Sequence, residues 1–195
     1  SALGEDEVRA TKEVLGFDPD VTFEVSDEVL RHARSVVGTG RERRVSWDEQ
    51  FAAWERAQPE RAALLARMRQ RRLPDGWADA LPTFDADPKG VATRKASGEV
   101  LAALYPVLPE LWGGSADLAE SNNTAVEGEP SFLPANRQTK MWSGGPYGRT
   151  LHFGVREHAM GAIMNGIALH GGTRVYGGTF LTFSDYMRGA VRLGA

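Results

Sequence analysis

The sequence predicts an α/β protein with a mainly parallel sheet flanked by helices, preceded by a helical linker segment. From Val91 onward, short apolar segments alternate with segments of helical character, which is typical of a parallel sheet covered on both faces. Up to about Pro88, by contrast, the sequence reads as short helices joined by loops. Because ligands of such sheets bind beyond the carboxyl ends of the strands, functional residues are expected at these ends.

The first part of the chain carries the start and stop signals of short helices. An acidic start and a closing glycine predict a helix over Glu5–Leu15. Ser26 is the expected cap of a second helix, which should end at Gly38. Ser46 and Glu49 form a capping-box pattern, so a third helix is expected to begin there.

The third and fourth predicted helices carry aromatic and basic side chains. Trp47, Phe51 and Trp54 fall on one helical face, which favours packing over a ligand platform. Pro59 should end this helix or start the next one. Four arginines crowd the last turn of the helix that follows Pro59, namely Arg67, Arg69, Arg71 and Arg72. They would suit an anionic partner, but the favoured interpretation is a solvated helix end that compensates the helix dipole.

The second part follows a linker-like stretch over Leu81–Gly90 and alternates between helices and strands. In chain order we expect a helix over Val91–Tyr105, a strand at Leu111–Trp112 that runs into Gly113, a strand over Leu151–Val155, a helix over His158–His170, a strand over Thr173–Tyr176 with a turn at Gly177–Gly178, and a helix capped by Ser184 and ending at Leu193. A loop over Ser121–Gly148 separates the first two strands. Loops of this length are usually functional or disordered.

Three predicted strand ends carry chemically useful side chains, at Gly113–Asp117, Arg156–Glu157 and Gly178–Phe183. Glu157 is the most informative of them, because it follows an apolar strand and precedes a helix. A carboxyl group in this position would be partly desolvated, and desolvation raises its pKa. The alternative is an ordinary first-turn glutamate that the helix dipole favours.

An aromatic residue recurs every third position at Phe180, Phe183 and Tyr186. This spacing favours the inner face of a helix, and a stacking wall for a flat heteroaromatic ring is the alternative. Arg94 has the planar guanidinium that suits a phosphate, although an exposed arginine is the default. Asp117 and Ser121, the latter at the start of the long loop, could equally be loop-capping residues.

Composition narrows the function classes. The 195 residues carry a formal net charge of -3, which gives no electrostatic case for a nucleic-acid partner. The absence of cysteine excludes disulfides and cysteine-based zinc sites. No apolar run reaches the ~20 residues that span a bilayer, and the acidic N-terminus is unlike a signal peptide. We therefore expect a cytoplasmic protein with no membrane partner.

Several segments together resemble one family, in order and in approximate spacing. They are ATRKAS at Ala92–Ser97, GGSADLAESN at Gly113–Asn122, LHFGVREHAMGAIMNGIALHGG at Leu151–Gly172 and YGGTFLTFSDYMRGAVRL at Tyr176–Leu193. They resemble transketolase. The resemblance implies a thiamine-diphosphate-binding fold in which residues 1–25 are the tail of the diphosphate-binding domain, 26–90 a helical linker and 91–195 a pyrimidine-binding domain that is incomplete at its C-terminus.

The resemblance implies a cofactor role for four side chains. Glu157 corresponds to the catalytic glutamate that bonds the aminopyrimidine ring nitrogen of thiamine diphosphate. A carboxyl group that gives this nitrogen a proton prepares the cofactor to lose the proton on its thiazolium carbon. Phe180, Phe183 and Tyr186 would form the aromatic pocket for the pyrimidine, with Phe183 the stacking partner.

The same resemblance implies roles for three polar residues. Asp117 falls where the family places a residue near the thiazolium, so we count it among the cofactor-binding residues. Arg94 and Ser121 match the positions that hold the phosphate end of the sugar substrate. No metal ligand is assigned in this chain.

The reaction implied is the transfer of a two-carbon ketol unit from a ketose phosphate to an aldose phosphate, in the pentose phosphate pathway. The implied cofactors are thiamine diphosphate and Mg²⁺ or another divalent cation, the metal being bound through parts not in this chain. The family places its cofactor between two subunits, which implies a homodimer. No Gly-Asp-Gly motif for metal and diphosphate occurs here, so we expect a fragment that is inactive alone.

Two alternatives stay open at this point. Dihydroxyacetone synthase and deoxyxylulose-phosphate synthase share the cofactor chemistry of transketolase. A non-catalytic fragment that serves as an assembly module belongs to a different class. Binding of the cofactor, or rescue of activity by an added diphosphate-binding domain, would separate an enzyme part from such a module.

Overall fold

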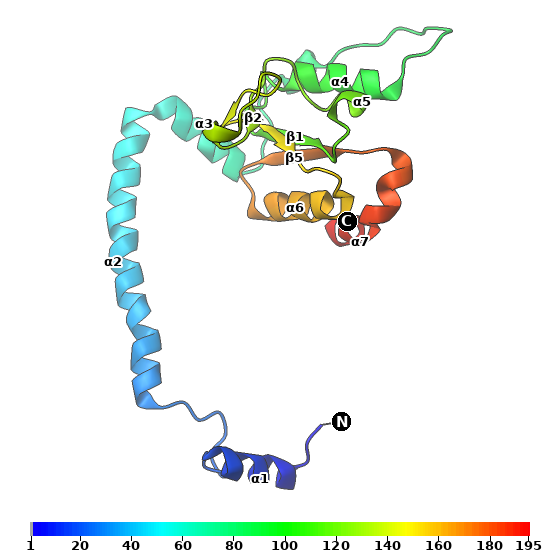
Figure 1. Ribbon diagram of the computed structural model, residues 1–195. Coiled ribbons are helices and arrows are strands. Elements are labelled where there is room, and N and C mark those ends of the chain that lie inside the picture. The colour runs from blue at the N-terminus through cyan, green and yellow to red at the C-terminus, as the bar shows by residue number, and fades with distance from the viewer. Residues whose placement is uncertain (1) are drawn as a thin grey trace. The chain divides into compact units, whose positions relative to one another are not determined.

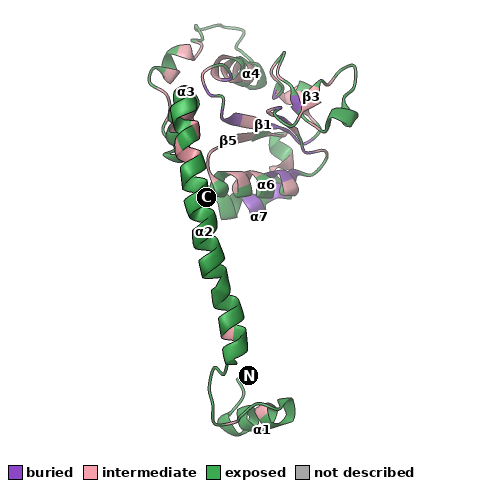
Figure 2. Ribbon diagram, turned by 90° about the vertical axis from the view of Figure 1, so that its left-hand side faces the viewer, coloured by how far each residue is buried: buried purple, intermediate pink, exposed green. Residues whose placement is uncertain are grey.

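The computed structural model describes residues 2–195 and divides the chain into two compact units, residues up to Gln58 and Pro59–Ala195 (Figure 1). Each unit is described by itself. In the described part of the chain, every buried residue lies in the second unit (Figure 2). The hydrophobic core, and with it the sheet, therefore belongs to Pro59–Ala195.

The first unit consists of two helices, α1 over Glu5–Leu15 and α2 over Asp27–Ala57. The predicted bounds of α1 are confirmed, and Gly16 ends it with a left-handed backbone at φ 77°. The predicted cap of α2 is also confirmed, since the Ser26 hydroxyl accepts a hydrogen bond from the Val29 N–H at 3.3 Å. Both helices begin with acidic side chains, which the helix dipole favours.

The predicted end at Gly38 and the new start at Ser46 are wrong, because α2 is continuous through both. A glycine inside a helix costs only about 1 kcal/mol, which neighbouring contacts offset. Trp47 stacks on Phe51 at 4.7 Å between ring centroids. Ser46 accepts a side-chain hydrogen bond from Gln50 one turn on, so it does not cap a helix.

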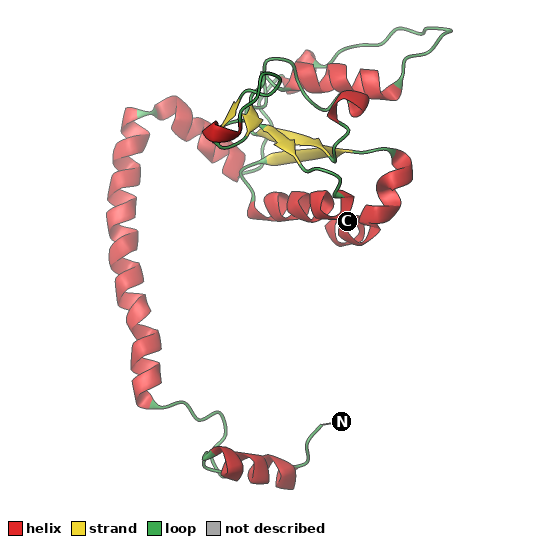
Figure 3. Ribbon diagram, viewed as in Figure 1, coloured by secondary structure: helices red, strands yellow, loops and turns green. Residues whose placement is uncertain are grey.

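The second unit contains a five-stranded sheet with helices on both faces (Figure 3). Its strands are β1 Leu111–Ser115, β2 Ser131–Phe132, β3 Gly144–Gly145, β4 Thr150–His152 and β5 Arg174–Gly178. Its helices are α3 Pro59–Arg69, η1 Trp77–Ala80, α4 Thr93–Leu104, α5 Ala119–Asn122, η2 Ala135–Arg137, α6 Glu157–His170, η3 Leu181–Phe183 and α7 Ser184–Gly194. The strand order is β3-β2-β4-β1-β5, and every pairing is parallel. The predicted parallel α/β architecture is confirmed.

Helices α6 and α7 cover one face of the sheet, and α4 and α5 cover the other (Figure 1). The core has two parts accordingly. One consists of Ala116, Phe153, Met160 and Met187 on the α6 and α7 side. The other consists of Tyr105, Leu108 and Leu111 on the α4 side. Buried apolar side chains on both faces explain why the strands read as short apolar runs.

The strand register brings the three expected strand ends together. Ser115, at the end of β1, pairs with His152 on one side and with Gly178 on the other. Gly178 is thus the last residue of β5, and the predicted Gly177–Gly178 turn is wrong. A Cβ atom at Gly114 would collide with the Leu151 carbonyl, so this position requires glycine.

Two further local predictions differ from the structure. The segment over Ser121–Gly148 is not a continuous loop, because β2 and β3 within it extend the sheet at one edge. Ser184 is the first residue of α7 and does not cap it. The reason is that η3 runs directly into α7, so Phe183 precedes the helix with a helical backbone.

The prediction of a solvated helix end for the arginines at the end of α3 is wrong for Arg67, whereas Arg69, Arg71 and Arg72 are exposed. The Arg67 guanidinium donates two hydrogen bonds to the Glu110 carboxylate, at 2.7 and 2.8 Å. Glu110 is 2% exposed, and Arg174 approaches it at 3.5 Å. Burial alone would raise the pKa of Glu110, but the Arg67 hydrogen bonds and the two positive charges outweigh it and hold that pKa below its ordinary value.

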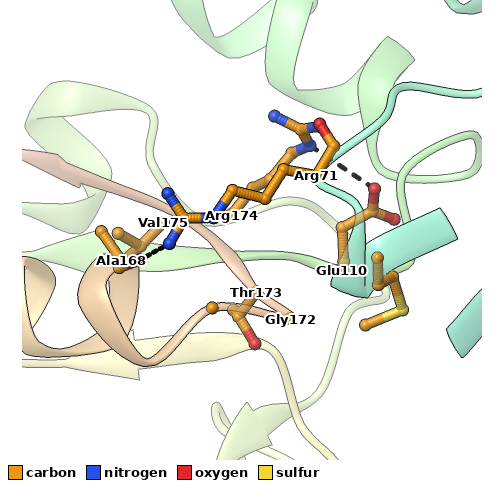
Figure 4. Close-up of a pocket in the computed structure, with 9 residues that line it drawn as sticks. Arg71, Glu110, Ala168, Gly172, Thr173, Arg174 and Val175 are labelled. Carbon is orange, nitrogen blue, oxygen red and sulfur yellow. Dashed lines mark hydrogen bonds and ion pairs between the residues drawn. The ribbon is translucent and has the colours of Figure 1, made fainter. Parts of the chain in front are cut away.

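Arg71 joins the same cluster at the amino end of β5. Its guanidinium donates to the Ala168 carbonyl near the end of α6 at 3.2 Å, while Arg174 donates to the Arg71 carbonyl at 2.7 Å. Figure 4 shows Arg71, Arg174 and Glu110 around a small pocket of about 280 Å³. These contacts join α3, α6 and β5, so this end of the sheet is held together by internally paired charges.

Candidate functional site

A cleft opens at the carboxyl end of β5, between that strand and helices α4 and α5. We call it the strand-end cleft. It has a volume of about 740 Å³ and is lined by Ala92, Thr93, Arg94, Ser97, Leu101, Ser121, Asn122, Thr124, Tyr176, Gly177, Gly178, Thr179, Phe180 and Leu181. This volume is in the range of small-molecule sites. Three of the sequence-predicted site residues meet here, namely Arg94, Ser121 and Phe180.

Arg94 is the positive charge of this cleft. It lies in the first turn of α4 and is exposed. Within residues 2–195, no hydrogen bond or ion pair satisfies its guanidinium group. Ser121 is half-buried on α5 and adds a hydroxyl group. An unpaired guanidinium beside a hydroxyl suits an anionic oxygen ligand such as a phosphate.

A second, smaller cleft of about 410 Å³ lies beyond the ends of β1 and β4. Asp117 and Ser121 both line it, with His152 and Arg156. Ser121 therefore belongs to both clefts. Asp117 is exposed and has a left-handed backbone at φ 64°. Such a conformation costs about 1–2 kcal/mol for a residue with a Cβ atom, although aspartate tolerates it better than most.

His152 connects this second cleft to strand β2. Its Nε2 atom lies 2.8 Å from the Ser131 hydroxyl, and its ring meets Trp142 edge-on at 4.6 Å. Burial lowers the pKa of His152. A neutral imidazole at this position can accept or donate a hydrogen bond, depending on its tautomer.

Glu157 is the first residue of α6 and is only 8% exposed. The chain reaches it from β4 through Gly154, whose backbone is left-handed at φ 67°. Among the described residues, no hydrogen bond or ion pair reaches the Glu157 carboxyl group. Neither carboxyl oxygen is among the fully buried polar atoms that lack a partner, so the group still reaches solvent at the helix N-terminus and is open to a ligand.

The aromatic residues Phe180, Phe183 and Tyr186 form a continuous row. Their neighbouring rings are 5.8 and 6.0 Å apart between centroids. Phe180 is 39% exposed and Tyr186 is 67% exposed. The interpretation as the inner face of a helix is therefore wrong for these two, and the buried face of α7 is formed instead by Met187 and Ala190.

Glu157 begins α6, and the aromatic row runs from Phe180 before η3 into the first turn of the adjoining helix α7. Helix α6 packs against α7 through Met160 and Met187, which share one core cluster. Gly161 lets the helices approach closely, since a Cβ atom there would lie 2.8 Å from the Ala190 side chain. The position of Glu157 relative to the row is therefore set by the packing of α6 against α7.

Sequence reasoning missed a buried network behind the strand-end cleft. The hydroxyl groups of Tyr105 and Tyr176 are 2.8 Å apart, and Tyr176 donates to the Thr124 carbonyl at 2.7 Å. Burial raises the pKa of both tyrosines. Arg149 lies over the Tyr105 ring and pairs with Glu129 at 2.7 Å. Neither arrangement has a short-range sequence signal, because the partners come from distant segments.

The fold and the site together define an α/β domain with clefts of small-molecule size at the carboxyl ends of parallel strands. Comparison with known proteins identifies the class further. Residues 89–195 match the family described as "Transketolase, pyrimidine binding domain", and residues 1–74 match "Transketolase, thiamine diphosphate binding domain". The chain belongs to the transketolase family.

Curated and solved relatives agree with this assignment. The chain is 60% identical to the transketolase of Mycobacterium tuberculosis over 195 residues and 47% identical to that of Geobacillus stearothermophilus over 194, which are 100% and 99% of this chain. Transketolase structures from Pichia stipitis and Leishmania mexicana match with TM-scores of 0.85 and 0.84, at 44% and 38% identity over 98% and 97% of this chain. The chain spans 28% of the length of the two curated relatives, and 28% and 27% of the two solved chains.

The described residues include neither a membrane-spanning helix nor a metal-binding cluster of side chains. No helix among the described residues is long and apolar enough to cross a membrane. Residues 2–195 contain no cluster of three or more His, Asp or Glu side chains arranged to hold a metal ion.

Proposed function

We propose that this chain is the pyrimidine-binding part of a transketolase, with a helical linker (26–90) between it (91–195) and the tail of the diphosphate-binding domain (1–25). The parent protein would transfer a two-carbon ketol unit from a ketose phosphate to an aldose phosphate. The observation that carries the proposal is the meeting of Arg94, Ser121 and Phe180 in one cleft at the end of β5. This cleft places an unpaired guanidinium and a hydroxyl group beside Phe180, the first ring of the aromatic row.

Thiamine diphosphate fits the groups that this chain presents. The aromatic row is exposed where a flat pyrimidine would stack, and the buried Glu157 carboxyl lacks an internal partner. When bound, thiamine diphosphate supplies the carbanion chemistry that carbon–carbon bond cleavage needs. Glu157 would hold a proton at the pyrimidine ring nitrogen, and Phe183 would orient the ring. Asp117, in the neighbouring cleft, would lie on the thiazolium side.

Sugar phosphates are the proposed substrates. Solved Pichia stipitis transketolases, 44% identical to this chain, are described as complexes with xylulose 5-phosphate, sedoheptulose 7-phosphate and fructose 6-phosphate. Arg94 and Ser121 would bind the phosphate end of such a sugar. This arrangement would leave the carbonyl end of the sugar free to point toward the cofactor.

The remaining features of the proposal concern parts beyond this chain. The diphosphate group and a divalent cation, Mg²⁺ or another, would be bound by a separate diphosphate-binding domain, and the working unit would be a cytoplasmic homodimer of the pentose phosphate pathway. The curated relatives quoted above are named transketolase, so dihydroxyacetone synthase and deoxyxylulose-phosphate synthase are not favoured.

An activity assay tests the proposal directly. The full-length protein, supplied with thiamine diphosphate and Mg²⁺, should transfer the ketol unit from a ketose phosphate to an aldose phosphate. The 195-residue chain alone should show no turnover, and omission of the cofactor should abolish turnover of the full-length protein. A full-length protein that binds the cofactor but transfers no ketol unit would contradict the proposal and favour an assembly module.

A further inference from the structure

We propose that Ser115 is a positioning residue, whose single hydroxyl group fixes the phosphate-binding wall of the strand-end cleft. The inference rests on the proposed function and adds a residue that need not touch substrate or cofactor. Ser115 is the last residue of β1, at the centre of the three strand ends. It is 4% exposed, and it lines the second cleft beside Asp117 but not the strand-end cleft.

The Ser115 hydroxyl makes three hydrogen bonds. It donates to the Gly178 carbonyl at 2.9 Å. It accepts from the Leu118 N–H at 3.1 Å and from the Asn122 side-chain amide at 3.2 Å. A serine hydroxyl has one hydrogen to donate and two lone pairs to accept with, so its capacity is fully used.

The two accepted bonds hold both ends of α5. Leu118 immediately precedes this helix and Asn122 is its last residue. A helix of four residues is too short to be stable by itself, and α5 ends at Asn123 with a left-handed backbone at φ 51°. Ser121 lies between the two held ends, so the position of its hydroxyl depends on the bonds to Ser115.

The end of β5 depends less on Ser115. The Gly178 carbonyl also accepts a hydrogen bond from the Ala116 N–H at 3.3 Å, which would remain without the serine hydroxyl. Gly178 is also packed against the Thr124 side chain, which leaves no space for a Cβ atom. Loss of the hydroxyl should therefore displace Ser121 more than Phe180, and phosphate binding should suffer more than cofactor binding.

Kinetics of Ser115→Ala in the full-length protein tests this inference. We expect KM for a phosphorylated aldose acceptor to rise about tenfold and kcat to stay within about twofold. The reason is that a contact to the phosphate stabilises the bound substrate and the transition state equally, so that its loss changes KM and not kcat. For an unphosphorylated acceptor, and for the Kd of thiamine diphosphate, we expect changes of less than about twofold. A serine that only stabilised the fold would not separate the two acceptors in this way.

A matched control is Ser131→Ala, which makes the same substitution on strand β2. Ser131 is 2% exposed, and its hydroxyl bonds His152 outside the strand-end cleft. This variant should leave the ratio of the two KM values unchanged. If Ser115→Ala does not fold, Asn122→Ala removes one of the three bonds and should raise the same ratio by a smaller factor.

The outcomes separate this inference from the proposed function. A wild-type protein without ketol transfer would overturn the proposed function and this inference with it. An active wild type, combined with an unchanged KM ratio in the folded Ser115 variant or in Asn122→Ala, would overturn the inference alone. Equal losses for both acceptors would do the same, because they indicate a general loss of structure.

Discussion

The two ends of the parallel sheet carry similar charged side chains but differ in what these contact. At the amino end, Glu110 is buried and paired with Arg67 and Arg174. At the carboxyl end, Arg94 and Asp117 are exposed, and neither forms an ion pair within residues 2–195. Pairing, rather than charge itself, thus separates the end that stabilises the fold from the end that is available to a ligand.

The largest expected effect is a loss of kcat on substitution of Glu157, at the carboxyl end of the sheet. Glu157→Gln in the full-length protein should lower kcat by about 10²–10⁴-fold, because a glutamine cannot hold and return the proton. The melting temperature should stay close to that of wild type, since no internal partner of the carboxyl is lost. The matched control is Glu60→Gln, an exposed first-turn glutamate of α3, which should leave kcat unchanged.

The next largest effect is a loss of stability on substitution of Glu110, at the amino end of the sheet. Glu110→Gln in the 195-residue chain should lower the free energy of unfolding by about 3 kcal/mol, because it leaves buried arginine charge without its counter-charge. Urea denaturation followed by tryptophan fluorescence measures it. Glu99→Gln, which removes an exposed carboxylate 3.9 Å from Lys95, is the control and should have little effect. Equal stability of the two variants would mean that the buried pair contributes nothing.

A smaller effect, a rise in KM on substitution of Arg94, tests phosphate binding at the carboxyl end. Arg94→Ala should raise KM for phosphorylated sugars about tenfold, which corresponds to one charge-assisted hydrogen bond of about 1.4 kcal/mol. The free energy of unfolding should not change, because no internal partner of Arg94 is lost. If unphosphorylated acceptors lose as much as phosphorylated ones, Arg94 does not bind phosphate.

The smallest effect is the pH dependence of stability. The pKa of Glu110 is lowered in the folded state, so its ionised form stabilises the fold above the ordinary glutamate pKa of about 4.3. This contribution is lost as the pH falls through the lowered pKa. The stability difference between wild type and Glu110→Gln should therefore be full at pH 7 and shrink below about pH 4. A difference that stays constant from pH 7 to pH 3 would contradict the lowered pKa.

The same contrast explains how much the sequence could predict. The apolar segments of the sequence and the rule of parallel sheets predicted that three strand ends meet, and the register of β1, β4 and β5 confirms it. The roles of Glu157 and Phe180 at these ends stay predictions. The Glu110 pair joins residues 43 positions apart in sequence, so no local pattern could reveal it. For this reason the prediction of a solvated helix end is wrong for Arg67, in the last turn of α3.

The predicted helix boundaries within α2 are wrong for a related reason. Gly38 and Ser46 carry stop and start signals of the right kind, yet α2 continues through both. Such signals are weak, at about 1 kcal/mol each, and side-chain pairs one turn apart outweigh them. Trp47 on Phe51 is one such pair. The Ser115 bonds were likewise missed, because a serine in a glycine-rich motif carries no sign of its three partners.

The exchange rate of the thiazolium carbon proton tests the central claim most directly. It is measured by deuterium exchange in the full-length protein with bound thiamine diphosphate, in wild type and in Glu157→Gln. We predict slower exchange in the variant by about 10²-fold or more, with cofactor affinity retained. Unchanged exchange in a variant that still binds the cofactor would contradict the role of Glu157, and with it the assignment of the carboxyl end as the cofactor site.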